Sequence, residues 1–354
     1  MILLYGYYGE CNAGDDAFTT VCIQELALRG HGPIGVLANH LPTIAGLPAK
    51  HLLTKHHFGG LAGHLEQARI RWWLARGARI VVGGGSLFRH SAGLLELERL
   101  LSRSPRTGHR AMGVSIGPFS DDRAADICAR VLQRFDSVGV RDLPSLERAK
   151  KIAPDARVEL SFDLAPLLPA FAPESSARTD RQTQELGVAL CGPAVTETEY
   201  HAIRQALEVW LAGGQDRKVV LLPFNEHPRK GDLPVHQRLA DELGHAGPVE
   251  LYRYRGDPRA IWTRIARLDG IVAMRLHAAV FGYCSERPVL IVPYEEKCTA
   301  WAQMIGQGSE FVVTAQELTD DHLAALSSRG RPTASLPVVD AKLRARTNFS
   351  WAEH

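Results

Sequence analysis

DGIVAMRLHAAVFGYCSERPVLIVPYEEK, residues 269–297, is the stretch that decides the fold. Two apolar runs rich in Val, Ile and Leu, 270–274 and 288–292, flank an apolar segment with the length of a short helix. Near-continuous apolar strands joined through a helix are typical of parallel sheets covered on both faces. The stretch therefore predicts a β-strand, a helix and a second, parallel β-strand.

The same alternation of short apolar runs and amphipathic segments extends along the chain in two sets. The first set of predicted strands covers 2–6, 32–39, 78–85, 109–117 and 137–142. The second set covers 186–192, 218–224, 249–254, 268–274 and 288–294. Repeated strand–helix units of this kind indicate an α/β protein with doubly wound, Rossmann-like domains.

The polar segment PAFAPESSARTDRQTQE separates the two sets and predicts a linker near residues 170–185. We therefore expect one Rossmann-like domain over 1–170 and a second over 185–335. The tail, 336–354, predicts a final amphipathic helix that packs back across both domains. Because open parallel sheets bind ligands at the carboxyl ends of their strands, we expect the two domains to face each other, with the active site in the cleft between them.

Composition limits the function. The 354 residues carry 41 Lys and Arg against 39 Asp and Glu, a net charge of +2, which argues against a nucleic-acid partner. An anionic ligand must therefore be bound by a few local cations. The six cysteines are dispersed without zinc-ligand spacing, and no leader or membrane span is visible. These features predict a cytoplasmic protein without a metal.

The loop GYYGECNAGDDAF, residues 6–18, follows the first predicted strand. Asn12 is expected to cap the next helix, and Asp15 and Asp16 then fall in its first turn. Acidic residues there can complement the helix dipole or contact a ligand, and both interpretations stay open.

Three glycines follow another predicted strand in ARIVVGGGSLF, residues 78–88. We expect Gly84, Gly85 and Ser86 to lie at a strand-to-helix turn where their backbone N–H groups approach a ligand; the alternative is a close strand-to-helix crossing without a ligand. The next motif, SIGPF at 115–119, is expected to be only a turn.

Several cationic residues are placed at predicted strand ends. In GVRDLPSLERAK, residues 139–150, Arg141 ends a strand and can bind phosphate or carboxylate, whereas Asp142 is expected to cap a helix. Arg275 and His277 interrupt an apolar strand-to-helix junction, where an unpaired buried arginine is too costly without a purpose. Lys297 follows the next strand.

Two further polar loops are less informative. PFNEHPRKGD, residues 223–232, also follows a strand, and either Glu226 or His227 lines the cleft or the loop is merely polar. HHFGGLAGH, residues 56–64, lacks metal-ligand spacing and is expected to be a loop over the acceptor.

Seven of these pieces in this order resemble the bacterial polysaccharide pyruvyltransferase family: GYYGECNAGDDAF, GGGSLF, SIGPF, VRDLPS, PFNEHP, MRLHAAVFGY and PYEEK. The resemblance implies a fold similar to GT-B glycosyltransferases, with an acceptor side at 1–170 and a donor side at 185–335. It implies phosphoenolpyruvate as co-substrate and neither a nicotinamide nor a metal.

The resemblance also implies roles for particular residues. His277, Arg141 and Lys297 fall on catalytic or donor-binding positions, and Arg275 and Leu276 fall on the donor-contacting Arg-Leu-His run. The remaining expected substrate-binding residues are Asn12, Asp15, Asp16, Gly84, Gly85, Ser86 and Glu296. The family's loops around Ser86 vary, which leaves the acceptor undefined.

Phosphoenolpyruvate carries a carboxylate and a phosphate, so clustered Arg and Lys are needed to neutralise it. Protonation of its methylene carbon makes C2 electrophilic, one sugar hydroxyl adds there, and a second displaces phosphate to close a cyclic ketal. His277 suits the proton transfer. Asp15, Asp16 or Glu296 would orient or deprotonate the sugar diol, and the sequence does not choose among them.

Two other functions remain open at this point: a GT-B glycosyltransferase that uses a nucleotide sugar, and a non-catalytic glycan- or anion-binding protein. The acceptor can be a lipid-diphosphate-linked oligosaccharide at the inner membrane face, a free polymer or a small glycoside. A homo-oligomer is compatible with the sequence.

Overall fold

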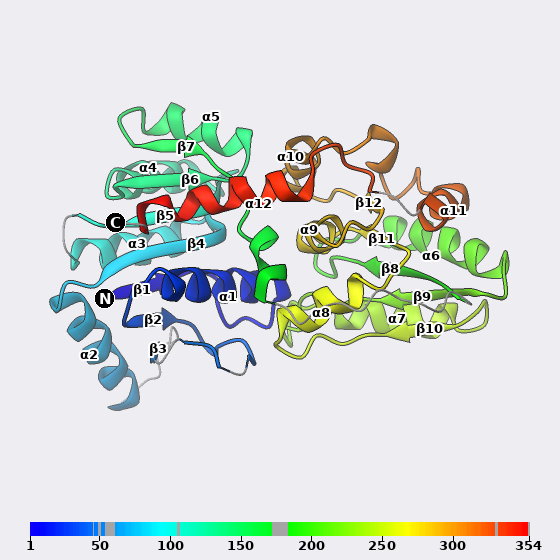
Figure 1. Cartoon of the computed structure of the whole chain (residues 1–354), viewed down its shortest axis with the longest axis horizontal. Coiled ribbons are helices and arrows are strands. Elements are labelled where there is room, and N and C mark those ends of the chain that lie inside the picture. Colours follow the sequence, from blue (N-terminus) through cyan, green and yellow to red (C-terminus); the bar gives the residue numbers. More distant parts are fainter. Residues whose placement is uncertain are drawn as a thin grey trace. The chain divides into compact units, whose positions relative to one another are not determined.

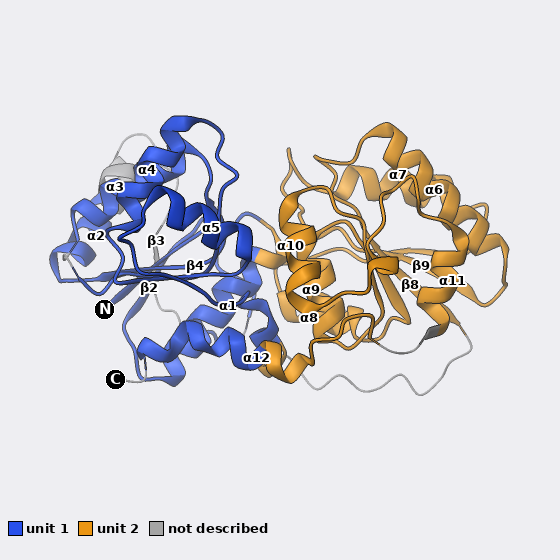
Figure 2. Ribbon diagram, turned by 90° about the horizontal axis from the view of Figure 1, so that it is seen from above, with its two compact units in different colours: residues 1–10, 15–168, 342–354 blue, residues 11–14, 169–341 orange. Residues whose placement is uncertain are grey.

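The computed structural model describes residues 1–44, 46–48, 51–53, 61–104, 107–171, 183–329 and 332–352. The chain forms two compact units (Figure 2). Unit 1 comprises Met1–Glu10, Asp15–Leu168 and Lys342–His354, and unit 2 comprises Cys11–Gly14 and Pro169–Ala341. Each unit therefore contains a short segment that is remote in sequence from the rest of it.

Unit 1 contains a seven-stranded parallel sheet with strand order β3-β2-β1-β4-β5-β6-β7 (Figure 1). The strands are β1 (Ile2–Tyr5), β2 (Ile34–Leu37), β3 (His51–Leu53), β4 (Arg79–Phe88), β5 (Arg110–Ile116), β6 (Ser137–Val140) and β7 (Val158–Leu160). The helices are α1 (Ala13–Leu28), α2 (Leu61–Ala75), α3 (Ser91–Ser102), α4 (Asp122–Leu132), α5 (Leu143–Ile152) and the 3-10 helices η1 (Ala165–Phe171) and η3 (Thr347–Ala352). Helix α1 begins within the Cys11–Gly14 segment of unit 2.

The apolar pattern explains why these residues fold in this way. All four residues of β1 and of β2 are buried, as expected for central parallel strands. Helix α4 buries Ala124, Ile127, Cys128 and Val131, which are three or four positions apart and lie on one face. Its N-terminus is capped by Asp121, whose side chain accepts a hydrogen bond from the Ala124 N–H.

Unit 2 contains a five-stranded parallel sheet with strand order β10-β9-β8-β11-β12. The strands are β8 (Gln184–Ala189), β9 (Arg217–Leu221), β10 (Val249–Leu251), β11 (Gly270–Ala273) and β12 (Val289–Ile291). The helices are α6 (Glu197–Ala212), α7 (Leu233–Leu243), α8 (Pro258–Ile265), α9 (Leu276–Cys284), α10 (Glu296–Ile305), η2 (Ser309–Phe311), α11 (Asp320–Arg329) and α12 (Val338–Arg346), which continues into unit 1. The stretch 269–297 thus forms the predicted strand, helix and parallel strand, and α9 is buried on nearly every side.

Both sheets show the predicted doubly wound order, and all ten predicted strands are present. Two further strands, β3 and β7, were not predicted; in β7, two of the three residues are exposed. Most of the predicted linker, 172–182, lies outside the described residues, as do 56–60 of the predicted acceptor loop. Residues 61–64 of that loop instead begin helix α2.

The glycine run is placed differently from the prediction. Gly83, Gly84 and Gly85 lie inside β4, and α3 begins only at Ser91, so they form no strand-to-helix turn. Gly84 and Gly85 have φ of 73° and 86°, and the register against β5 shifts after Gly85. A Cβ on Gly84 would lie 2.5 Å from the Phe18 ring. Glycine is needed here because the strand bends closely past α1.

The C-terminal segment also differs from a single helix over 336–354. Helix α12 ends at Arg346 and is followed by η3. Buried Asn348 fixes this segment within unit 1, because its Oδ1 accepts the Gly113 N–H at 2.9 Å and its Nδ2 donates to the Phe162 carbonyl at 3.0 Å.

Candidate functional site

Unit 2 has its topological switch point between β8 and β11, where connections leave the sheet in opposite directions. Open parallel sheets bind ligands at the carboxyl ends of strands at such a point. Cys191 follows β8, and Arg275 follows β11 and precedes α9. The residues of unit 2 that the sequence singled out therefore start at the edge where a ligand is expected.

Arg275 is held by a carboxylate. Its Nε lies 3.1 Å from Oδ1 and 2.9 Å from Oδ2 of Asp232, and its Nη2 also contacts Oδ1. The Arg275 side chain is 15% exposed, and that of Asp232 is fully buried. Burial opposes the charge on Arg275, but the neighbouring Asp232 raises the pKa of the guanidinium above its usual range. Arg275 therefore stays charged and fixed in orientation.

The remaining nitrogen of Arg275, Nη1, has no hydrogen-bond partner among the described residues. Arg275 is also the residue that precedes the first turn of α9, whose backbone N–H groups lack partners within the helix. Leu276 is buried, so a contact with a ligand would come from its backbone rather than its side chain. One guanidinium N–H pair and a helix N-terminus thus combine into a site suited to an anion.

Asp232 links three strand ends. Its Oδ1 accepts the N–H of Gly192, which follows β8, at 2.9 Å, and its Oδ2 accepts the N–H of Asn225, which follows β9, at 2.9 Å. Arg275 supplies the third connection from β11. Asp232 precedes α7 at the cap position but makes no side-chain cap, because its carboxylate is used in this network.

His236 completes the network one turn into α7. Its Nδ1 lies 2.8 Å from the Asp232 carbonyl oxygen, and its Nε2 accepts the Leu190 N–H at 3.1 Å. These partners require a neutral ring with the proton on Nδ1. Burial lowers the pKa of His236 below its usual value, against the opposing effect of Asp232. A neutral histidine therefore fixes the backbone that carries Asp232.

His277 lies in the first turn of α9 and is partly buried. Its ring is packed against Gly14, where a Cβ would collide with ring atoms. The segment that carries Gly14 is attached to the loop after β9: the Ala13 N–H donates to the Phe224 carbonyl at 2.8 Å, and the Glu226 N–H donates to the Cys11 carbonyl at 2.9 Å. The N-terminal loop thereby becomes one wall beside His277.

Lys297, in the first turn of α10, contributes a second cation to this edge. Its Nζ lies 2.7 Å from Glu295 and 4.8 Å from the centre of the Tyr294 ring. Burial raises the pKa of the Cys191 thiol to about 11, although Arg275 and Lys297 act in the opposite direction. Cys191 is therefore a neutral thiol within the field of both cations.

Glu296, the first residue of α10, is exposed. Its prediction as a substrate-binding residue has no further support from burial, and it stays a prediction. In unit 2, the structure thus brings together Arg275, His277 and Lys297 at one sheet edge, with the N–H groups of α9.

Unit 1 has its own switch point, between β1 and β4. The Tyr8 hydroxyl donates to the Gly83 carbonyl at 2.7 Å and accepts the Gly83 N–H at 3.1 Å, which fixes the glycine run. Position 85 lies beside Asp15, since a Cβ there would be 3.7 Å from Asp15 Oδ1. Asp15 is partly exposed, whereas Asp16 is fully buried. Of the two carboxylates, Asp15 is the better placed to meet a ligand.

The predicted helix caps are confirmed. The Asn12 Oδ1 accepts the Gly14 N–H at 3.0 Å in the first turn of α1. Asp142 caps α5 by accepting the Ser145 N–H at 2.8 Å, with proline in the first turn.

Arg141 follows β6 and is 4% exposed. Its Nη1 lies 2.8 Å from the fully buried Asp163, its Nε donates to Ser115 at 2.7 Å, and its Nη2 lies 3.4 Å from Ser86. The guanidinium is thus bonded within unit 1, and only the longer Nη2 contact is weak. Arg141 and the cations at the edge of unit 2 belong to different units, so their predicted shared pocket stays a prediction.

The sequence interpretation missed Asp232, His236 and Asp163. In PFNEHPRKGD, Asp232 has the local features of a helix cap and nothing more, and His236 follows one turn later. Among the described residues, no group of three or more His, Cys, Asp or Glu is arranged to hold a metal ion. Within the same residues, no helix has the length and apolar character to cross a membrane.

Two Rossmann-like domains, each with a parallel sheet and a switch point, define a fold of the GT-B type. S. aureus MnaA, in a structure with UDP, matches with a TM-score of 0.64 and 9% identity, over 100% of this chain and 98% of that chain. Anabaena HepE in complex with UDP-glucose matches with a TM-score of 0.62 and 13% identity, over 99% and 96%. WaaG, a glycosyltransferase involved in lipopolysaccharide biosynthesis, matches with a TM-score of 0.56 and 13% identity, over 98% and 95%. At these identities the likeness shows the fold alone.

The family model for polysaccharide pyruvyl transferase matches residues 12–296, which span both units. The chain belongs to this family of transferases of polysaccharide biosynthesis, as the sequence motifs predicted. No curated protein matches the chain.

Proposed function

We propose that the protein transfers pyruvate from phosphoenolpyruvate to two hydroxyls of a sugar, forms a cyclic pyruvate ketal and releases phosphate. The observation that supports this most directly is the arrangement of Arg275, which Asp232 orients while Nη1 stays available beside the N-terminus of α9. A compact dianion with a carboxylate and a phosphate matches such a site. Family membership points to the same class of reaction.

The proposed steps balance without a redox change. A proton adds to the methylene carbon of phosphoenolpyruvate, and the first sugar hydroxyl forms a bond to C2 as it loses its proton. The second hydroxyl then bonds to C2, the C2–oxygen bond to phosphate breaks, and phosphate leaves. Overall, one C–H bond and two C–O bonds form, while the C=C π bond, the C–O bond to phosphate and two hydroxyl O–H bonds break. One hydroxyl proton replaces the proton that was added to carbon, and the other leaves with phosphate.

We assign each of these steps to residues of this chain. His277 transfers a proton, because imidazole accepts and donates protons near neutral pH. Arg275 and Lys297 stabilise the negative charge that grows on the leaving phosphate. We assign Asp15 to the sugar diol in preference to Asp16, which is buried; the exposed Glu296 is the alternative. We propose that no metal takes part; complete loss of activity in EDTA, restored by one divalent cation, would contradict this.

The test is mass spectrometry of candidate acceptors incubated with phosphoenolpyruvate: a lipid-diphosphate-linked oligosaccharide, a free polysaccharide and simple glycosides. We expect one acceptor to gain one pyruvylidene unit, with release of an equal amount of phosphate. The His277→Ala variant is the control for transfer by a contaminant. If phosphate is released without a product of higher mass, the protein hydrolyses phosphoenolpyruvate and the proposal is wrong.

A glycosyltransferase that uses a nucleotide sugar is the second candidate, because structures with the same fold contain UDP or UDP-glucose. The same anion site would suit a diphosphate leaving group. Release of UDP from a UDP-sugar, with no phosphate released from phosphoenolpyruvate, would favour this candidate over the first.

A further inference from the structure

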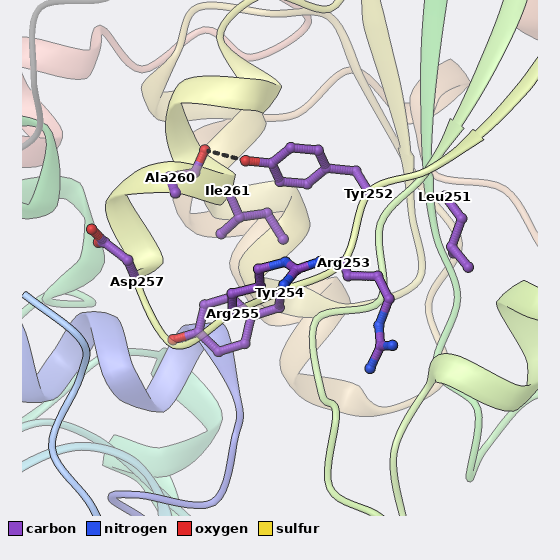
Figure 3. A pocket seen from close by; sticks show the side chains of 8 residues that line it. All are labelled: Leu251, Tyr252, Arg253, Tyr254, Arg255, Asp257, Ala260 and Ile261. Carbon is purple, nitrogen blue, oxygen red and sulfur yellow. Dashed lines mark hydrogen bonds between the residues drawn. The ribbon is translucent and has the colours of Figure 1, made fainter.

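A concave site apart from Arg275 lies in unit 2 at the carboxyl end of β10, next to the start of α8 (Figure 3). It is a cavity of about 280 Å³ lined mainly by the stretch from Leu251 to Asp257. This stretch alternates tyrosine and arginine: Tyr252, Arg253, Tyr254 and Arg255. The proposed chemistry at Arg275 uses none of these residues.

The charges around this cavity do not cancel. Arg253 is neutralised by Glu226, with Nε 3.1 Å from Oε1 and Nη2 2.5 Å from Oε2. Asp257 is bonded to the Arg259 side chain at 3.0 and 2.9 Å and also caps α8. Arg255 is exposed, and no carboxylate among the described residues pairs with it. The cavity therefore presents one uncompensated guanidinium.

The remaining lining residues are aromatic or aliphatic. Tyr254 and Ile261 are buried, and the Tyr252 hydroxyl lies 3.4 Å from the Ala260 carbonyl (Figure 3). Tyrosine rings and aliphatic side chains suit the C–H faces of a sugar ring, whereas a guanidinium binds carboxylate or phosphate in a forked geometry. Drug-sized ligands occupy pockets of roughly 300–1,000 Å³, so this cavity fits one monosaccharide unit better than a whole nucleotide sugar.

The loop after β9 connects this cavity to the anion site. Asn225 donates its N–H to Asp232, the carboxylate that orients Arg275. The next residue, Glu226, holds Arg253 at the cavity wall. The two sites thus share one loop at the same edge of one sheet.

We propose that the cavity beside Arg255 binds a negatively charged sugar unit of the acceptor glycan, next to the ring that receives pyruvate. The charge can belong to a sugar phosphate or to the carboxylate of a uronic acid, because a guanidinium binds both. The assignment of this unit to an acceptor rests on the proposed pyruvyl transfer. The binding of an anionic sugar at Arg255 does not depend on it.

The experiment measures binding without catalysis, by calorimetric titration of the intact protein with glucose 6-phosphate, glucuronate, neutral glucose and UMP. We expect at least one anionic sugar to bind more tightly than glucose. Arg255→Ala should weaken that binding about tenfold, the usual loss for one charge-assisted contact. The matched control is Arg267→Ala, an exposed arginine just before β11, at the opposite edge of the sheet. It should leave the affinity unchanged.

The anionic sugar whose affinity falls in Arg255→Ala shows whether the bound charge is a phosphate or a carboxylate. Equal affinities of the wild type and Arg255→Ala for both anionic sugars would overturn the proposal, as would UMP binding that depends on Arg255 while neither sugar binds. Thermal unfolding of the same samples verifies that the wild type and both variants are folded. If anionic sugar binding depends on Arg255 but no pyruvate is transferred to any acceptor, the proposed function fails and the sugar site stands.

Discussion

The Arg275 guanidinium and the Asp232 carboxylate form a forked ion pair across 43 positions of sequence, with Nε 2.9 Å from Oδ2. Asp232 is fully buried and also accepts two backbone N–H groups, so four donors converge on one carboxylate. This carboxylate therefore has two roles: it orients Arg275, and it holds the ends of three strands together.

Asp232→Asn should weaken the binding of phosphoenolpyruvate. An amide has one acceptor oxygen, so it cannot satisfy Gly192, Asn225 and Arg275 together. We expect KM for phosphoenolpyruvate to rise by roughly 10- to 100-fold, the equivalent of a lost charge-assisted contact. Steady-state kinetics measure this effect. Glu250→Gln is the matched control, because it removes a carboxylate that pairs with Arg264 away from the anion site. An unchanged KM in folded Asp232→Asn would refute the positioning role.

His277→Ala and Arg275→Ala should have different effects on turnover and on phosphoenolpyruvate affinity. Loss of a general acid–base group lowers turnover by about 10²–10⁴-fold, while phosphoenolpyruvate affinity stays within about tenfold because Arg275 and Lys297 still supply charge. Arg275→Ala should weaken phosphoenolpyruvate binding as well. Kinetics and thermal unfolding are measured on the same samples. Normal turnover with a lowered melting temperature in His277→Ala would make His277 a packing residue.

Gly14→Ala should impair the protein through His277. A Cβ at position 14 would collide with the imidazole ring, so the ring or the start of α1 must move. We expect lower turnover and a loss of stability of about 1–3 kcal/mol, typical of overpacking. Gly93→Ala is the matched control, because Gly93 lies within helix α3 and its added methyl meets nothing within 4 Å. That variant should be stabilised by about 0.5–1 kcal/mol. Equal behaviour of the two variants would contradict the collision.

Arg141 can be tested together with Asp163. Arg141→Met removes the guanidinium that lies 2.8 Å from the buried Asp163 carboxylate and should cost about 3–5 kcal/mol of stability. Arg141→Met with Asp163→Leu removes both charges and should recover much of that loss. If Arg141 binds the donor, the stable double variant still lacks activity. Full activity of the double variant would show that Arg141 only supports the fold. Unfolding experiments measure the stability of each variant, and rate measurements give its activity.

The stability of the protein should fall below about pH 6.5, the usual pKa of an unfolded histidine, in part because of His236. Burial lowers the pKa of His236 in the folded state, so the unfolded state binds a proton that the folded state resists. One such group contributes a slope of up to about 1.4 kcal/mol per pH unit. Denaturant unfolding at pH 7.5 and 5.5 should therefore show a smaller loss for His236→Gln than for the wild type. Equal losses would mean that His236 is not neutral when folded.

The sheets were predictable from the sequence because each central strand is a nearly continuous apolar run. In β11 and β12, every residue is buried, and a continuous apolar run is the pattern typical of a parallel strand covered on both faces. Strand β7 was missed because Val158–Leu160 is short and largely exposed, and its place depends on pairing with β6. The glycine run was misplaced because glycine permits both a turn and a bent strand, and contacts with residues distant in sequence, such as Tyr8 and Phe18, favour the bent strand.

The site was predictable only in part. Arg275, His277 and Lys297 were recognisable because charge interrupts an apolar pattern at strand ends. Their partners were not, since a pattern read along the chain does not say which distant carboxylate faces which cation. Asp232 had the local features of a helix cap, and Asp163 those of an ordinary loop residue.

Cys11–Gly14 belong to unit 2 and Lys342–His354 to unit 1, so a cut at the linker separates each segment from the unit to which it belongs. A fragment ending at residue 170 lacks Asn348 and so loses the hydrogen bonds of its side chain with the Gly113 N–H and the Phe162 carbonyl. The complementary fragment lacks the Cys11–Gly14 segment, which includes Gly14 beside the His277 ring. We therefore expect neither half of the chain to fold stably by itself, although each contains a complete parallel sheet.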